Sequence, residues 1–306
     1  MNAIPRPAPM ALWFQPPGTP IDELLSTEHE VLMGQNVPGA VPAPAPRRSA
    51  AGQGRVRWIS AATIAALVLV WWIASALALV SPVFLPSPVA VVQKAIAVAT
   101  VGYVDGTLWH HLSASLGRVA AALALAAAIG IPVGVAIGAS PVGRGIFDPL
   151  LEFLRPIPPL AYLPLVVIWL GIGETSKVVV IAIAMLAPIA LSTAAGVRGT
   201  SRERVNAART LGASRGQIVR HVILPSALPQ IFTGLRIALG AGWTTLVAAE
   251  LIAATEGLGF MIQSAANFLV TDVVVMGIFV IAGIAFAIEF VLRRLERRFV
   301  PWSGRD

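Results

Sequence analysis

Uncharged apolar runs of membrane-spanning length constrain this chain more than any other feature of its sequence. Crossing the hydrocarbon core of a bilayer takes about 20 consecutive apolar residues in a helix. Four such runs contain no ionised side chain: residues 58–80, 119–138, 156–173 and 178–197. Two further runs carry one or two charges: residues 229–253 and 273–292. The sequence therefore predicts an all-α integral membrane protein with about six transmembrane helices, the third of them short and rich in proline.

Lysine and arginine are distributed unevenly among the connections, and this bias predicts how the spans are oriented. Cationic residues number five before residue 58, two in the 139–156 loop, seven in the 198–236 stretch and five after residue 292. The alternate connections hold only Lys94, Arg118 and Lys177. Both termini and residues 198–228 are therefore expected on the cytoplasmic side of an inner (plasma) membrane. The same bias explains the net charge of +7, so no nucleic-acid partner is expected.

Composition divides the chain into regions. Residues 1–57 are rich in proline and alanine, and such a segment buries too little apolar surface to offset the entropy of ordering. We expect a disordered cytoplasmic extension there, with a short docking helix at residues 22–32 as the alternative. An additional N-terminal transmembrane helix is expected at residues 58–80, an outer loop with short helices at 81–118, and the membrane core at 119–300.

His110 and His111 follow Trp109 in the expected outer loop. Neighbouring side chains on a helix point in different directions, so two adjacent histidines are poorly placed to chelate one ion. No Asp, Glu or Cys stands three or four residues away from them, and the chain contains no cysteine. We therefore interpret these residues as anchors at the membrane interface and expect no metal site.

Helix-breaking residues are dense inside the expected spans, as in residues 130–138 and 156–164 and at Pro188. Lipid cannot satisfy a backbone group that proline leaves free, so such helices face other helices or a water-filled path. Small residues four apart, such as Gly130, Gly134 and Gly138, also allow helices to pack closely. Both interpretations, a translocation path and close packing, stay open and are compatible.

Few charges lie within the spans. Glu289 and Arg293 are four residues apart on one helix face, which favours a local ion pair. Glu250 ends the fifth span, with Thr244 and Thr245 shortly before it. A hydrated carboxylate at the interface is one interpretation of Glu250, and a gate or substrate-path residue, together with the two threonines, is the other.

The most polar stretch between two spans is NAARTLGASRGQIVRHVILP, residues 206–225. Thr200 with Glu203 and Ser214 with Gln217 match the capping box, in which a hydroxyl and a later Glu or Gln satisfy free N–H groups at a helix start. Gly212 lies between them, where a residue able to adopt positive φ ends one helix and redirects the chain. The sequence predicts a helix, a sharp bend and a second helix.

The second of these helices is expected to end at Pro225 and Pro229. It carries an apolar stripe of four residues: Ile218, Val219, Val222 and Ile223. The stripe would give the projecting element an apolar face to offer a partner. A DNA-reading helix-turn-helix is excluded, because too few residues separate the flanking spans to supply a third helix.

This element resembles the cytoplasmic signature of the membrane subunits of binding-protein-dependent ABC importers. The signature is EAA, three residues, Gly, nine residues, Ile, one residue and Leu-Pro. Its places are occupied here, in register, by Asn206, Ala207, Ala208, Gly212, Val222, Leu224 and Pro225. Asn206 replaces the glutamate, which puts a role for a carboxylate there in doubt. Runs such as SPVFLPSP, RPIPPLAYLPLVVIWLGIGETSK and LVAAELIAATEGLGFMIQSA are similar to the nitrate, sulfonate and taurine branch, most of all to its taurine permeases.

The resemblance implies a type I importer (MetI-like) fold and a set of partners: a second copy of the chain, two cytoplasmic ABC ATPase subunits, and an extracytoplasmic substrate-binding protein. Residues 200–225 would be the element that couples to the ATPase, with Ala213 and Ser214 beside Gly212 taking part. No catalytic, cofactor or metal residue is implied on this chain, since ATP and Mg²⁺ would bind the partner. In agreement, neither lysine, Lys94 or Lys177, follows a glycine, so no phosphate-binding loop of the G-x-x-x-x-G-K-[ST] type is present.

The function implied is import of taurine or a related alkanesulfonate, driven by ATP hydrolysed on another subunit. Nitrate, bicarbonate or a vitamin precursor is the alternative substrate. A proton-coupled secondary transporter is the alternative of another class. Such a transporter uses intramembrane ionisable relays, and the spans offer only Glu250 and Glu289 as carboxylates.

Overall fold

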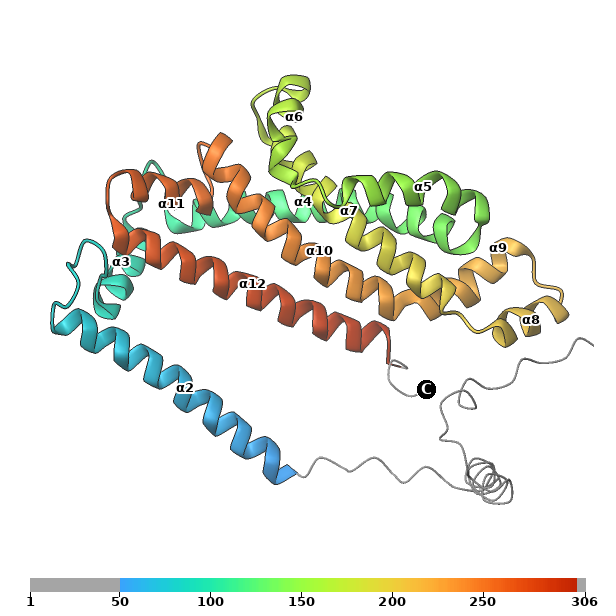
Figure 1. Ribbon diagram of the computed structural model, residues 1–306, viewed down its shortest axis with the longest axis horizontal. Helices are drawn as coiled ribbons and strands as arrows, with labels where there is room; N and C mark the ends of the chain where they lie inside the picture. Colours follow the sequence, from blue (N-terminus) through green and yellow to red (C-terminus); the bar gives the residue numbers. More distant parts are fainter. Residues whose placement is uncertain (1–49, 302–306) are drawn as a thin grey trace, which may run out of the picture. The chain divides into compact units, whose positions relative to one another are not determined.

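The computed structural model describes residues 50–301, and within this range every named element is a helix. In chain order they are α2 (Ala50–Ala76), α3 (Pro88–Thr100), α4 (Leu108–Ala139), α5 (Pro141–Leu154), the 3-10 turn Pro159–Ala161, α6 (Leu163–Leu170), α7 (Glu174–Arg198), α8 (Arg202–Thr210), α9 (Arg215–Ile218), the π-helical turn Val219–Ile223, α10 (Leu224–Ala253), α11 (Leu258–Asn267) and α12 (Thr271–Phe299) (Figure 1). The docking helix considered at residues 22–32 and most of the predicted extension lie outside the described residues. Residues 50–57, predicted as its end, instead begin α2, because they contain no proline to interrupt the helix.

Five helices in the described part of the chain are long and apolar enough to cross a membrane. They are Trp58–Ala76, Leu108–Ala139, Glu174–Arg198, the run Arg215–Ala253 and Thr271–Phe299. The all-α membrane class is thereby confirmed. The single span expected at residues 156–173 is wrong, because only the 3-10 turn and the eight-residue α6 form there. Its prolines, at positions 156, 158, 159 and 164, break the backbone hydrogen bonds that a continuous helix would need.

The chain divides into two compact units, residues 1–64 and residues 65–306, and α2 runs through the boundary between them. In the first unit the described apolar side chains point outward, with Trp58 79% and Ile64 63% exposed. In the second unit Trp71 stacks on Phe279 of α12, with ring centroids 5.8 Å apart, and its indole N–H donates to the carbonyl of Pro86. The later half of α2 is therefore held by specific contacts.

Three helices, α4, α7 and α10, form the main core of the second unit. Its buried side chains come from all three, and they include Val119 and Ala126 of α4, Met185 of α7, and Trp243 of α10. A smaller core joins α3, α11 and α12, where Val98, Met261 and Met276 are fully buried. The predicted ion pair between Glu289 and Arg293 on α12 is confirmed, at 2.9 Å.

Close helix packing explains the glycines of α4. A Cβ on Gly134 would lie 2.5 Å from Cβ of Thr193, and one on Gly138 would lie 2.5 Å from Cβ of Val197. Neither distance is physically tolerable, so both positions let α4 approach α7 as only glycine allows. The close-packing interpretation of these glycines is confirmed, and these contacts also show that α4 and α7 run parallel.

Because α4 and α7 are parallel, the chain must return along their length between Ala139 and Glu174. Helix α5 begins this return: its Leu151 packs with Ile137 of α4 and Ala187 of α7. Helix α6 completes it, since Leu163 and Val166 pack with Val180 near the start of α7 and with Ala249 near the end of α10. The third crossing therefore exists, but as a broken segment of two helices that starts at residue 141.

Two other boundaries differ from the predictions. The short helix expected between the first two spans is present as α3, capped by Ser87. Residues 108–118, expected as loop, instead form the first three turns of α4, whose start is capped by the hydroxyl of Thr107. They were missed because His110, His111, Ser113 and Ser115 make this stretch polar, although His111 and Ser115 are buried in a network that only the folded chain assembles.

Candidate functional site

The polar element at residues 200–225 has the predicted arrangement of a helix, a bend and a second helix. Its first helix, α8, begins one residue later than expected: Ser201 is the cap and accepts a hydrogen bond from the Arg204 amide. The predicted capping role of Thr200 is wrong, because its hydroxyl donates to the carbonyl of Gly196 in the preceding helix.

The predicted bend at Gly212 is confirmed, with φ of +80°. The amide of Ala213 donates to the carbonyl of Ala208 at 3.1 Å, and the amide of Gly212 donates to the carbonyl of Arg209 at 2.9 Å. This pair of bonds is the Schellman motif, which ends a helix through a residue in the left-handed conformation. A Cβ on Gly212 would meet nothing within 4 Å. Glycine is therefore favoured here by backbone conformation and not by lack of space.

The predicted capping box at Ser214 and Gln217 is also confirmed, since each side chain bonds the backbone N–H of the other residue. The second helix was predicted to end at Pro225 and Pro229, and this prediction is wrong. The helical run continues without a break from Arg215 to Ala253. The wider π-helical turn Val219–Ile223 ends two residues before Pro225 and makes room for a residue that cannot donate to the preceding turn.

The apolar stripe of the second helix was predicted to be free to contact a partner, and this prediction is wrong. Ile218 is 5% exposed, and the other three members of the stripe are half-buried within the chain. The outward apolar side chain is Leu211, 88% exposed at the tip of the bend. Asn206 and Ala207 are exposed, while Ala208 and Ala213 are half-buried. What the element offers a partner is therefore the bend itself and the outer side of α8.

A cavity of about 370 Å³ lies against the middle of α7. Its walls come from the end of α5, the broken segment before α6, residues 183, 184 and 186–188 of α7, and residues 241, 244 and 245 of α10. Polar side chains in the lining are Arg155, Tyr162, Thr244 and Thr245, and no carboxylate contributes to it. The two threonines predicted as path residues therefore line one cavity, together with the guanidinium of Arg155 and the phenol of Tyr162.

Glu250, predicted with the threonines, lies elsewhere. It is 1% exposed, and its carboxylate accepts hydrogen bonds from Arg118 Nη1 at 2.6 Å, Ser115 Oγ at 2.7 Å and the Gly259 amide at 2.8 Å. The hydrated carboxylate interpretation is wrong, because the first three turns of α4, which precede the expected span, cover this residue. A role of Glu250 in a substrate path stays a prediction. Its contacts show that it joins α10 to α4 and α11.

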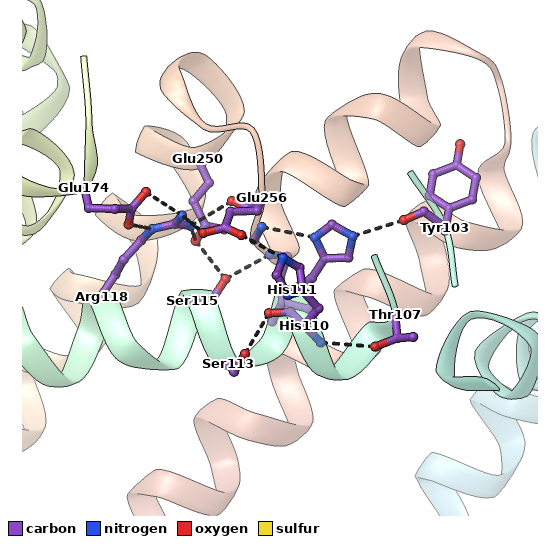
Figure 2. A network of polar contacts seen from close by, with 12 residues as sticks. Tyr103, Thr107, His110, His111, Ser113, Ser115, Arg118, Glu174, Glu250 and Glu256 are labelled. Atoms are coloured by element: carbon purple, nitrogen blue, oxygen red, sulfur yellow. Dashed lines mark hydrogen bonds and ion pairs between the residues drawn. The ribbon is translucent and has the colours of Figure 1, made fainter. Parts of the chain in front are cut away.

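Arg118 is the buried centre of a network whose outer members, among them Glu174, are partly exposed (Figure 2). Its guanidinium binds Glu174 through two parallel hydrogen bonds, from Nε to Oε2 and from Nη2 to Oε1, and Nη1 also donates to the carbonyl of Glu256. Lys177 donates to Glu174 at 2.8 Å. Paired in this way, a 2% exposed arginine ties together the start of α7, the end of α10 and the loop that follows α10. The geometry joins helix ends and leaves no donor directed at a ligand.

The two histidines were predicted to be anchors at the membrane interface, but their contacts give them another role. His111 is 1% exposed, with Nδ1 accepting from the Gly257 amide at 3.2 Å and Nε2 lying 3.1 Å from the carbonyl of Tyr103. These partners require the neutral tautomer with the proton on Nε2. His110 pairs with Glu256 at 2.7 Å. Both residues therefore extend the network of Arg118 around the loop after α10.

Sequence reasoning missed Arg118, Glu174, Arg155 and Tyr162 as notable residues. The first two looked like ordinary charges at span ends, and their partners are 56 and 132 positions apart along the chain. Arg155 stood in what was expected to be a loop. One signal was available: Arg155 and Tyr162 flank the cluster of prolines that breaks the third crossing, and broken helices in membranes line cavities.

The chain is similar to known membrane components of transport systems. Residues 126–301 match the family model described as "Binding-protein-dependent transport system inner membrane component". The chain is 58% identical over 247 residues to the taurine transport system permease protein TauC of Escherichia coli (strain K12), covering 80% of this chain and 90% of that protein. It is 34% identical to the putative aliphatic sulfonates transport permease protein SsuC of Bacillus subtilis (strain 168), covering 84% and 92%. A solved inward-facing structure of the MetNI methionine ABC transporter shares the fold, with a TM-score of 0.55 at 22% identity over 61% of this chain and 93% of that one.

Proposed function

This chain belongs to the family of inner membrane components of binding-protein-dependent transport systems, and we propose that it forms the membrane path of an ATP-driven importer for taurine or a related alkanesulfonate. The observation that carries the substrate is the 58% identity to a taurine permease over 90% of that protein's length. Similarity to a sulfonate permease supports the same chemical class.

The proposal includes the partners that such a path requires. Two copies of the chain would enclose the path, two cytoplasmic ABC ATPase subunits would supply energy, and an extracytoplasmic protein would deliver substrate. ATP and Mg²⁺ would bind the ATPase, because this sequence lacks a phosphate-binding loop of its own. With residues 200–225 on the cytoplasmic side, as the positive charge bias favours, the network of Arg118 would lie at the outer end of the bundle.

The bend between α8 and α9 would be the coupling element. It presents exposed Leu211 with Asn206 and Ala207 beside it, and it is joined without interruption to α10. Closing of the ATPase dimer would move this element and with it the membrane helices, switching access from one side to the other. Val222, Leu224 and Pro225 would set the exit angle of the element and would not themselves contact the ATPase.

Uptake by proteoliposomes tests the function. We expect vesicles that contain the chain, its ATPase and its binding protein to accumulate taurine only when ATP is present on the ATPase side. Uptake that follows a proton gradient in the absence of ATP would instead establish a secondary transporter. Uptake of nitrate or bicarbonate with no uptake of sulfonates would retain the importer and overturn the substrate.

Substitution at the bend tests the coupling element. Gly212→Val places a branched side chain at φ of +80°, at a cost of about 1–2 kcal/mol, and should reduce both co-purification of the ATPase and taurine uptake by a factor of ten or more. Gly212→Asn is the matched control, because asparagine tolerates this conformation, and it should retain most of both activities. Equal, wild-type behaviour of the two variants would remove the coupling role from this bend.

A further inference from the structure

An arginine, Arg155, lines the cavity beside α7. Within residues 50–301 no hydrogen bond or ion pair joins the Arg155 guanidinium to another group, although this side chain lines the cavity. The cavity residues of α7 lie within 183–188, in the middle of a helix that runs from Glu174 to Arg198. A cation at this depth of a membrane is costly unless it meets a counter-charge or water, which makes it a candidate for function.

The polar groups of the cavity fall into two sets. Arg155 and Tyr162, from the broken segment around α6, offer N–H and O–H donors, and neither side chain has a partner among the described residues. On the opposite walls, Thr244 and Thr245 already donate their protons to the carbonyls of Gly240 and Ala241, so each retains only acceptor capacity. The carbonyl of Ala184, which also lines the cavity, is a further acceptor, because Pro188 has no N–H to donate to it.

This division of donors and acceptors fits a particular class of solute. Without a carboxylate in its lining, the cavity carries the single positive charge of Arg155. A sulfonate offers three oxygens to donors and has the negative charge that a guanidinium binds best. An ammonium group on the same molecule would find the threonine hydroxyls and the free carbonyl of α7. The volume, about 370 Å³, is within the usual range of small-molecule sites.

We propose that this cavity is the intramembrane binding site for the sulfonate substrate, with Arg155 and Tyr162 holding its sulfonate group. The proposal rests on the proposed function, and it adds the residues that make the path selective for anions. Arg155 acts on the solute directly, whereas Arg118 acts only on the helices that surround it.

The test compares two arginines of one segment in the reconstituted transporter. Arg155→Gln removes the charge from the cavity, and Arg144→Gln removes an exposed charge from α5 outside it. The quantity measured is the amount of taurine taken up per ATP hydrolysed. Loss of a hydrogen-bonded charge partner should lower it about 10- to 100-fold in Arg155→Gln. Arg144→Gln should match wild type, and Arg155→Lys should recover part of the loss.

A second variant guards against a general effect of charge. Tyr162→Phe removes one hydroxyl and no charge, and it should lower uptake per ATP by about 3- to 10-fold. If uptake and ATP hydrolysis fall by the same factor in Arg155→Gln, or if neither falls, the cavity is not the binding site and the proposal is overturned. Failure of the wild-type transporter to accumulate taurine would instead overturn the proposed function, so the two failures are distinguishable.

Discussion

Arg118 and Arg155 belong to the same helical unit, but Arg118 is buried, whereas Arg155 is exposed at the edge of a cavity. Arg118 is 2% exposed, with Glu174 and Glu250 bound to its guanidinium and Glu256 close by. Arg155 lines an open cavity with no carboxylate in its walls. In a membrane protein the residue type alone therefore does not distinguish a structural arginine from a functional one. The two roles are distinguished by whether other groups of the fold already neutralise the charge.

The largest expected effect comes from removing the satisfied charge. Arg118→Met would leave Glu250 buried without its cation, and losing one partner of a buried pair costs about 3–5 kcal/mol. We expect a large fall in the thermal unfolding temperature of the purified protein. Arg155→Met should change the free energy of unfolding by less than about 0.5 kcal/mol, because it leaves no charge unpaired. Equal losses in the two variants would erase the distinction between these arginines.

The backbone at Gly257 offers a second test of the network around Arg118. Gly257 has φ of +120°, and a Cβ there would lie 2.5 Å from Cδ of Glu250 and 2.6 Å from Nη1 of Arg118. Gly257→Ala should destabilise the protein by about 1–3 kcal/mol through conformational strain, to which displacement of the ion pair adds. Its control is Gly117→Ala, next to Arg118 on α4, where a Cβ meets nothing within 4 Å.

In a helix the control substitution should be neutral or stabilising by up to about 1 kcal/mol. Thermal unfolding of both variants in the same detergent measures the difference. A stable Gly257→Ala protein would mean that the network tolerates displacement and does not clamp the helix ends.

The smallest effect is expected at the rim of the network. Glu256 is 37% exposed and lies 3.6 Å from Arg118 Nη2. Exposed ion pairs contribute less than about 1 kcal/mol, so Glu256→Gln should lower the unfolding temperature only slightly. A loss as large as that of Arg118→Met would show that the network acts as one unit and not as a buried centre with a weak edge.

The features predicted well from the sequence are those that local chemistry decides. The bend at Gly212 and the capping box of Ser214 and Gln217 depend on residues within a few positions of each other, so their spacing was enough. The network of Arg118 could not be predicted in this way, since its partners meet only after α4, α7 and α10 have packed. For the same reason the covered position of Glu250 was missed.

The third crossing shows a different limit. Apolar composition at residues 156–173 indicates that a segment prefers lipid, but it does not indicate that the segment is one helix. The prolines that break it were visible, and their effect was underestimated because the break also depends on α5, which packs back on α4 and α7. The cavity with Arg155 is a product of that break, and no pattern along the chain predicts its shape.

Helix α10 (Leu224–Ala253) has a mechanical consequence. It is anchored near one end by the ion pair of Glu250, and at about 1.5 Å per residue its other end, at Leu224, is about 40 Å away. Thr244 lies only about 9 Å from the anchor by the same measure. If α10 pivots as a stiff rod about Glu250, a tilt of about 10° displaces its Leu224 end, which leads into the bend, by about 7 Å and the cavity wall by less than about 2 Å. The helix would then be a reducing lever, which converts a long stroke at the nucleotide-driven end into a small, forceful adjustment around the solute.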